Sequence, residues 1–179
     1  MALIELELND INDHVGDSME FEVSGDVSDP QLPGIGQGVI NPVTVKGVAI
    51  NSGDGILVEA TADAKVGLIC SRCLEDFQTR LSVPISCEYR KGEAVEESRP
   101  EGGRELSWYQ GDSIDLSGEV RDQLLLEVPM KPLCDEKCRG LCSQCGINLN
   151  HQGCECVFDD IDDRLAPLKT LLKEGEQEE

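Results

Sequence analysis

The chain has 179 residues, of which 39% are hydrophobic, and its formal net charge is -21. This length allows one hydrophobic core, or one core with a small metal-stabilised appendage, and no apolar run approaches the roughly 20 residues that a membrane-spanning helix needs. The chain does not start with the basic and apolar regions of a signal peptide, so we expect a cytoplasmic protein without a membrane partner, and its acidity disfavours a naked nucleic-acid duplex as its sole ligand.

The N-terminal half predicts a meander of short antiparallel strands. Four segments are predicted as strands, because their apolar residues alternate with polar ones or because turn-forming residues separate them: 3–8, 43–50, 55–62 and 65–70. We expect the first to be an edge strand. Turns are predicted at residues 51–54 and at Asp63 with Ala64, and residues 24–38 carry turn chemistry throughout.

The clearest strand covers residues 80–90. Apolar side chains occupy every second position on one of its faces: Leu81, Val83, Ile85, Cys87 and Tyr89. Cys87 is therefore expected to be a small core residue and not a ligand. Pro84 cannot donate a backbone hydrogen bond, which places it at an edge or a bulge of the sheet.

One helix is predicted after this strand, and it should pack on the sheet. Residues 91–105 have almost no apolar side chain and predict a loop. Asp115 is a plausible helix cap, Pro129 ends the helix, and apolar residues recur between them at helical spacing: Leu116, Val120, Leu124 and Leu125. A short terminal helix is expected over residues 163–173, followed by an acidic tail.

The cysteines carry the most specific pattern in the chain. Besides Cys87, eight of the nine cysteines form four close pairs: Cys70 with Cys73, Cys134 with Cys138, Cys142 with Cys145, and Cys154 with Cys156. A secreted disulfide protein is usually small and has an even number of cysteines, so metal binding is the better prediction. Eight thiolates would make two tetrahedral zinc sites, because each short pair supplies half of a site.

The strongest half-site is Cys142 with Cys145, since the following Gly146 can adopt a positive φ as the chain leaves the metal. Its expected partners are Cys154 and Cys156. Disulfides and an iron–sulfur cluster are the alternatives, because thiolate ligands alone do not identify the metal. His151, which is adjacent to this site, is an alternative ligand.

The second site is expected to join Cys70 and Cys73 to Cys134 and Cys138 through the fold. Alternatively, Cys134 or Cys138 joins the downstream site, and Cys70 and Cys73 remain free thiols or form a redox pair. No combination of residues suggests a catalytic site or a small-molecule substrate, since zinc bound by four thiolates has no open position for water.

These elements predict an α+β fold. We expect an antiparallel β-sheet or partly closed β-barrel with one packed helix in residues 1–133. Residues 134–179 would hold the small zinc-binding segment, the short terminal helix and the acidic tail.

The chain closely resembles the bacterial YceD family, the large ribosomal RNA subunit accumulation proteins. The resemblance runs over residues 43–172 and rests on an ordered set of segments: 70–74, 114–116, 124–129, 138–146, 148–150 and 163–165. It implies a non-enzymatic role in accumulation of large-subunit (23S) ribosomal RNA and in assembly of the large ribosomal subunit. Genes of this family often neighbour the gene for a small basic ribosomal protein. Some relatives lack the downstream cysteines, which implies a structural role for that site.

Two hypotheses describe the contact with the large-subunit precursor. An acidic surface would dock a basic ribosomal protein or a protein face of the precursor particle. Alternatively, the protein binds ribosomal RNA directly, with Arg72 and Arg139 near the zinc sites as contacts. Residues 65–139 contain eleven Lys or Arg and fifteen Asp or Glu, so no basic domain is visible and protein docking is favoured. A thiol redox switch is the third hypothesis.

Overall fold

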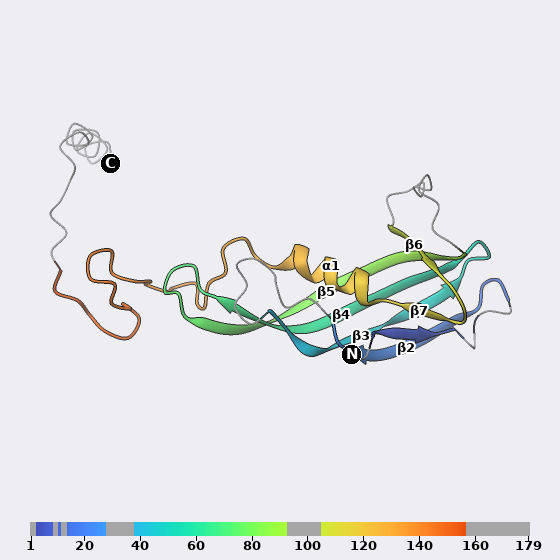
Figure 1. Cartoon of the computed structure of the whole chain (residues 1–179), viewed down its shortest axis with the longest axis horizontal. Helices are drawn as coiled ribbons and strands as arrows, with labels where there is room; N and C mark the ends of the chain where they lie inside the picture. Colours follow the sequence, from blue (N-terminus) through green and yellow to red (C-terminus); the bar gives the residue numbers. More distant parts are fainter. Residues whose placement is uncertain (1–2, 9–10, 12–13, 28–37, 93–104, 157–179) are drawn as a thin grey trace, which may run out of the picture. The chain divides into compact units, whose positions relative to one another are not determined.

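The computed structural model describes residues 3–8, 11, 14–27, 38–92 and 105–156 of the chain. Its elements follow in the order β1 (Glu5–Glu7), β2 (Ser18–Gly25), β3 (Gly38–Asn51), β4 (Ile56–Ile69), β5 (Asp76–Lys91), β6 (Glu105–Tyr109), β7 (Ser113–Asp115) and α1 (Ser117–Glu127). The regular secondary structure of the described residues is therefore mostly strand, with one helix (Figure 1).

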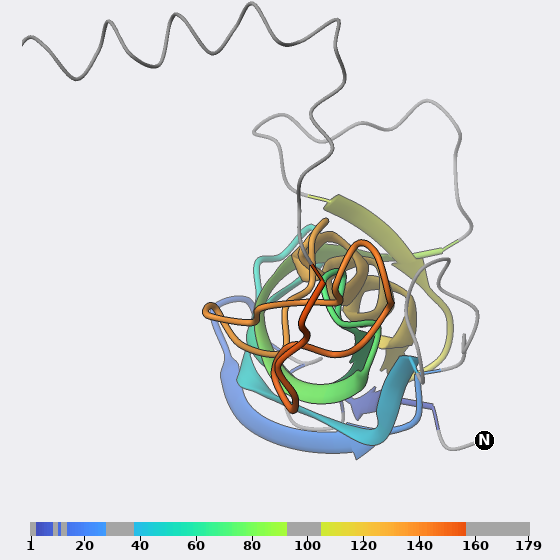
Figure 2. The same ribbon diagram turned by 90° about the vertical axis from the view of Figure 1, so that its left-hand side faces the viewer.

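Five strands form the main sheet in the order β2-β3-β4-β5-β6. All neighbours pair antiparallel except β5 and β6, which pair parallel over residues 87–91 of β5. The expected antiparallel sheet with one packed helix is thus found, with one parallel pair that the sequence analysis did not predict. The sheet is curved around α1 (Figure 2), but it is not closed, so the partly closed barrel is not confirmed.

One predicted turn is wrong. Asp63 and Ala64 do not end a strand, because β4 runs without interruption from Ile56 to Ile69. Asp63 points to solvent on the exposed face, while Ala62 and Ala64 are buried on the other face. Hydrogen bonding to both neighbouring strands outweighs the turn preference of this short sequence.

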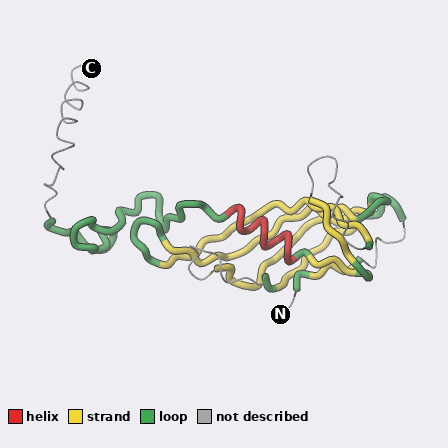
Figure 3. The backbone as a smooth tube through the Cα atoms, turned by 45° about the horizontal axis from the view of Figure 1, so that its top comes forward, coloured by secondary structure: helices red, strands yellow, loops and turns green. Residues whose placement is uncertain are grey.

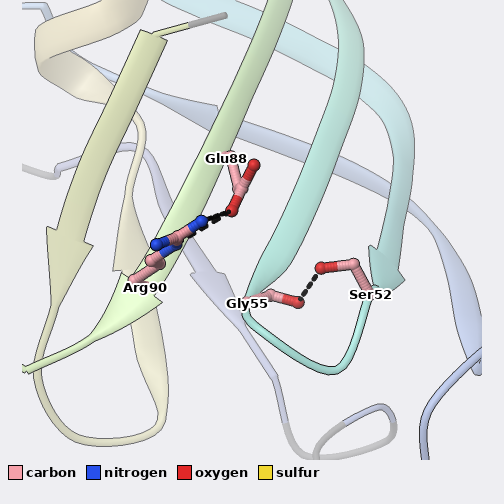
Figure 4. Close-up of polar contacts among 4 residues, drawn as sticks. All are labelled: Ser52, Gly55, Glu88 and Arg90. Carbon is pink, nitrogen blue, oxygen red and sulfur yellow. Dashed lines mark hydrogen bonds and ion pairs between the residues drawn. The ribbon is translucent and has the colours of Figure 1, made fainter. Parts of the chain in front are cut away.

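The predicted turn at residues 51–54 is confirmed, and its polar groups are satisfied locally. The hydroxyl of Ser52 donates to the carbonyl of Gly55 at 2.9 Å (Figure 4), and the backbone N–H of Ser52 donates to the same carbonyl, also at 2.9 Å. Asn51 Oδ1 accepts a hydrogen bond from the N–H of Gly53, which has a φ of 92°. Glycine fits this left-handed position without strain.

The hydrophobic core lies between one face of the sheet and α1. Val83, Ile85, Cys87 and Tyr89 of β5 are buried, as the alternation predicts, and Leu81 is half-buried. Pro84 lies in the part of β5 that has β4 on one side and that β6 does not reach, so its missing N–H removes no ladder bond to β6. The core is closed by α1, which buries Val120 and Leu124 against β5.

The ends of α1 follow the sequence signals closely. Asp115 Oδ1 accepts a hydrogen bond at 2.9 Å from the N–H of Ser117, the first helical residue. The residue at the cap position itself is Leu116, so Asp115 satisfies the helix start from one position earlier. The helix ends at Glu127, before Pro129.

A separate two-stranded ribbon joins the start of the chain to the region before α1. β1 pairs antiparallel with β7, with Leu6 opposite Ile114. Figure 3 shows the single helix, in red, lying along the strands, in yellow. Ile4, Leu6 and Leu8 contribute to the core, which fits the predicted two-sided strand at residues 3–8. The strands β2, β6 and β7 were not predicted.

The chain divides into two compact units, Met1–Cys138 and Arg139–Glu179. The first unit ends later than the expected boundary at residue 133, so it includes Cys134 and Cys138. The expected helix over residues 163–173 and the acidic tail lie outside the described residues, as does most of the expected loop 91–105. Among the described helices, none is long and apolar enough to cross a membrane.

Candidate metal centres

The structure brings eight cysteines into two groups of four. The first group, here the Cys70 cluster, contains Cys70, Cys73, Cys134 and Cys138. The second group, the Cys142 cluster, contains Cys142, Cys145, Cys154 and Cys156. Within each group the four sulfur atoms lie within 4.8 Å of one another, so each cluster could hold a metal ion.

The first half of the Cys70 cluster is the turn that joins β4 to β5. The N–H of Cys70 donates to the carbonyl of Glu75 at 2.9 Å, and the N–H of Leu74 donates to the carbonyl of Cys70 at 2.9 Å. Leu74 has a φ of 59°, the left-handed conformation that turns the chain back after Cys73. The two sulfurs are therefore positioned by a hairpin of the main sheet.

The second half of this cluster comes from the segment after α1. Ser71 N–H donates to the carbonyl of Pro132 at 2.8 Å. The Nη1 atom of Arg72 donates to the carbonyls of Glu136 and Cys138, both at 2.9 Å. These bonds hold the segment against the hairpin, which explains how cysteines more than 60 positions apart meet.

The sulfur spacing in the Cys70 cluster fits a tetrahedral ion. Four sulfurs at about 2.3 Å from one zinc ion are about 3.8 Å apart. The sulfurs of Cys70 and Cys138 are 3.8 Å apart, and those of Cys73 and Cys134 are 3.6 Å apart. A disulfide would require about 2.05 Å, and none of the nine cysteines, all of which lie in the described residues, forms a disulfide.

The Cys142 cluster is built by a local loop. The N–H of Gly146, whose φ is 73°, donates to the carbonyl of Cys142 at 2.9 Å, and Cys142 N–H donates to the carbonyl of Ile147 at 2.8 Å. Asn148 Oδ1 accepts from the N–H of Asn150 at 2.9 Å. Asn150 Oδ1 in turn accepts from the N–H of Arg139 at 2.8 Å, which closes the loop on its own beginning.

The electrostatics of the Cys142 cluster favour a bound cation. Backbone N–H groups of Cys145 and Gln144 point at the sulfur of Cys142 and lower its pKa to about 6. The neighbouring sulfur of Cys145, together with burial, raises the pKa of Cys156 to about 12. The negative charges of neighbouring thiolates repel each other, which opposes deprotonation of all four cysteines. A cation bound between the sulfurs would offset this repulsion.

The same arrangement of donors occurs at Cys70. Its burial raises the pKa, but backbone N–H groups of Cys134, Cys73 and Arg72 outweigh burial and lower the pKa to about 6. The Arg72 N–H lies 3.5 Å from the Cys70 sulfur. Thiolate character is what a metal ligand needs.

Other expected residues lie elsewhere. Cys87 is in the core with 2% of its surface exposed and belongs to neither cluster, and His151 belongs to neither cluster. The guanidinium of Arg72 donates to backbone carbonyls within the first unit, and Arg139 is an exposed residue of the second unit; their role as contacts to RNA or a partner stays a prediction. The sequence analysis did not predict that Arg72 holds the segment after α1 against the β4–β5 hairpin, an interaction here called the Arg72 latch. It also did not predict that Asn148 and Asn150 close the loop of the Cys142 cluster.

Several known proteins are similar to the chain. A chloroplastic protein of Arabidopsis thaliana, "Large ribosomal RNA subunit accumulation protein YCED homolog 1", is 38% identical over 66 residues, which is 37% of this chain and 21% of that protein. An uncharacterized protein of Mycobacterium tuberculosis is 28% identical over 157 residues, covering 85% of this chain and 74% of the relative. The uncharacterized protein YlbN of Bacillus subtilis is 28% identical over 141 residues, covering 77% of this chain and 78% of the relative.

The chain therefore spans about a fifth of the length of the plant relative and about three quarters of the bacterial ones. No solved structure matches it. The sequence model of one family, described as "Large ribosomal RNA subunit accumulation protein YceD", matches residues 58–172, a stretch that includes both cysteine clusters. Because this match covers well over half of the sequence, the chain belongs to the YceD family of large ribosomal RNA subunit accumulation proteins.

Proposed function

We propose that this protein is a non-enzymatic factor that supports accumulation of 23S ribosomal RNA and assembly of the large ribosomal subunit in the cytoplasm. Membership of the YceD family is the observation that carries this proposal, because the named relatives are described by accumulation of large-subunit RNA. The plant relative is named as chloroplastic.

We further propose that zinc occupies both cysteine clusters and has a structural role. All-thiolate donor sets suit zinc, and the sulfurs of the Cys70 cluster are 3.8 Å and 3.6 Å apart, while those of the Cys142 cluster lie within 4.8 Å of one another. Four thiolates leave no open position for a reacting water. Cys70, Cys73, Cys134 and Cys138 would hold one ion, and Cys142, Cys145, Cys154 and Cys156 the other. The zinc would then stabilise the surfaces that face the precursor without taking part in a reaction.

The proposed mode of action is docking of a basic ribosomal protein or of a protein face on the precursor. An acidic strip on the β1–β7 ribbon supports it. Glu5 and Asp115 are exposed and directly opposite each other, and neither forms a salt bridge within the part of the chain that the structure describes. Like charges in directly opposed positions are unfavourable in a sheet, and a basic partner would relieve them.

Crosslinking in cells tests this mode. The protein should form adducts with a ribosomal protein of the large-subunit precursor. The variant Glu5→Gln/Glu7→Gln removes both exposed carboxylates of β1 and should reduce these adducts several-fold, with greater salt sensitivity in wild type. The matched control, Glu59→Gln/Glu127→Gln, removes two exposed carboxylates elsewhere and should leave the adducts unchanged. Exclusive RNA adducts would overturn protein docking, and unchanged 23S RNA levels on depletion of the protein would overturn the proposed function itself.

A further inference from the structure

An open hollow of about 550 Å³ lies on the solvent-exposed face of the main sheet. Its polar lining comes from four strands: Glu22 of β2, Thr44 and Lys46 of β3, Asp63 and Lys65 of β4, and Arg80 of β5. None of its lining residues belongs to the Cys70 cluster.

The hollow is made by a bulge in β3. The register of β3 on β4 shifts between Ile40 and Thr44, so three residues of β3 stand opposite the single residue Ala64. Pro42, within the bulge, has no N–H to donate to the ladder and lines the hollow. Bulges of this kind are over-represented next to functional sites, where they redirect side chains.

Two cations in this hollow face each other, and neither is paired with a carboxylate of the described residues. Lys65 and Arg80 are direct cross-strand partners, and both are exposed. Like charges directly opposite each other destabilise a strand pair. Neither residue forms a salt bridge or a side-chain hydrogen bond with any residue that the structure describes.

Other cations on the same sheet are compensated. Lys46 contacts Glu22 at 3.0 Å, and Arg90 contacts Glu88 at 2.9 Å (Figure 4). Lys91 contacts Asp112 at 3.6 Å. On a chain with a net charge of -21, carboxylates are abundant, so an uncompensated pair of cations is unexpected for a face that is only solvated.

The shape of the surface indicates an extended ligand. A second hollow, of about 380 Å³, is lined by Lys65, Gln78, Thr79 and Arg80, so the same two cations stand between two adjoining hollows. A single small anion would fill only part of this space. A flexible chain with repeated anionic groups would fit both hollows, and guanidinium and ammonium groups are the usual contacts of phosphate.

We infer that this hollow binds the phosphate backbone of single-stranded RNA, with Lys65 and Arg80 as the contacts. The choice of RNA among polyanions rests on the proposed function. Phosphate contacts carry no sequence information, so binding should be independent of sequence and sensitive to salt. Asp63, which also lines the hollow, should oppose the phosphate and limit the affinity.

Fluorescence anisotropy with a labelled RNA of about 12 nucleotides, titrated with the full chain at about 50 mM salt, tests this inference. The affinity of Lys65→Gln/Arg80→Gln should fall about tenfold, and the slope of log affinity against log salt should decrease by about 0.7 for each lost phosphate contact. Asp63→Asn should bind more tightly than wild type. The control Arg90→Gln/Lys91→Gln has the same net charge as the first variant but removes compensated cations, and its affinity should change less than about twofold.

Each outcome decides the inference. Equal losses in the two double variants would mean general electrostatics, and a labelled poly-glutamate peptide that binds as well as the RNA would mean a protein ligand; both overturn it. Lack of wild-type binding at low salt overturns it as well. Misfolding is separated by thermal unfolding, since removing the like-charged pair should leave the variant at least as stable as wild type. If RNA binding behaves as stated but depletion of the protein leaves the 23S RNA level unchanged, RNA binding at the hollow is supported and the proposed function is refuted.

Discussion

The turns at Cys70–Cys73 and Cys142–Cys145 have the same backbone conformation. They differ in the residue after the second cysteine and in how far along the chain the other two cysteines of the cluster lie. In each, the residue after the second cysteine is left-handed and its N–H bonds to the carbonyl of the first cysteine at 2.9 Å. That residue is Leu74 in the Cys70 cluster and Gly146 in the Cys142 cluster. The first cluster gathers its second half from 61 or more positions away, whereas the second lies wholly within residues 142–156.

Because the ligands of the two clusters differ in their separation along the chain, a metal ion would affect the stability of the two units differently. An ion in the Cys70 cluster would connect the β4–β5 hairpin to the segment after α1, in a unit that already has a hydrophobic core. The described part of the second unit, residues 139–156, has only Gly140 and Cys142 buried. Metal would therefore strengthen the first unit but would supply most of the folding free energy of the second.

Removal of all metal should give the largest effect. Under reducing conditions a strong chelator should unfold residues 139–156 completely, because structural zinc sites contribute about 10 kcal/mol or more in small domains that lack a core. The first unit should stay folded at room temperature. Hydrogen exchange read by region, with metal analysis of the starting protein, measures this. Close to two zinc ions per chain are expected, one for each cluster, and a metal-free reduced protein with full protection would refute zinc binding.

Paired cysteine substitutions separate the two clusters. Cys70→Ser/Cys73→Ser should lower the free energy of unfolding of the first unit by about 4 kcal/mol, the value for releasing a constraint on a loop of about 60 residues. Cys142→Ser/Cys145→Ser should leave that transition in place and expose only the second unit to protease. Calorimetry and limited proteolysis read the two effects. Identical thermal transitions in both variants would show that the two clusters do not stabilise different parts of the chain.

The Arg72 latch is a smaller effect within the first cluster. Arg72→Gln removes the charged donor that bonds to the carbonyls of Glu136 and Cys138, and we expect a loss of about 1–2 kcal/mol, since the guanidinium is exposed to solvent. Lys137→Gln, an exposed side chain in the same segment, is the control and should change stability by less than about 0.5 kcal/mol. Thermal unfolding with metal retained measures both. An equal change in the two variants would mean that the latch bonds add nothing.

Local patterns in the sequence predicted the elements whose signals are themselves local. The alternation from Leu81 to Tyr89 identified the core strand, Asp115 and Pro129 bounded the helix, and the close cysteine pairs marked the turns that now form the clusters. A pattern failed where tertiary contacts decide. Asp63 has a turn preference that pairing with two neighbouring strands overrides, and the carbonyl partners of Arg72 lie 64 and 66 positions away, beyond any local signal.

Substitution of the left-handed residue after the second cysteine of each turn gives the smallest expected effect and compares the two turns most directly. No atom lies within 4 Å of a β-carbon placed on Gly146, so Gly146→Ala meets no steric contact and its cost, about 1 kcal/mol, is that of the positive φ alone. Leu74→Gly should relieve the same strain, partly offset by the greater freedom of glycine in the unfolded chain, and should raise stability by no more than about 1 kcal/mol. Competition with a colorimetric chelator measures zinc release from each cluster. If Leu74→Gly instead weakens metal retention, the exposed leucine stabilises its turn by a contact beyond backbone conformation, and the two turns are not equivalent in energy despite their shared geometry.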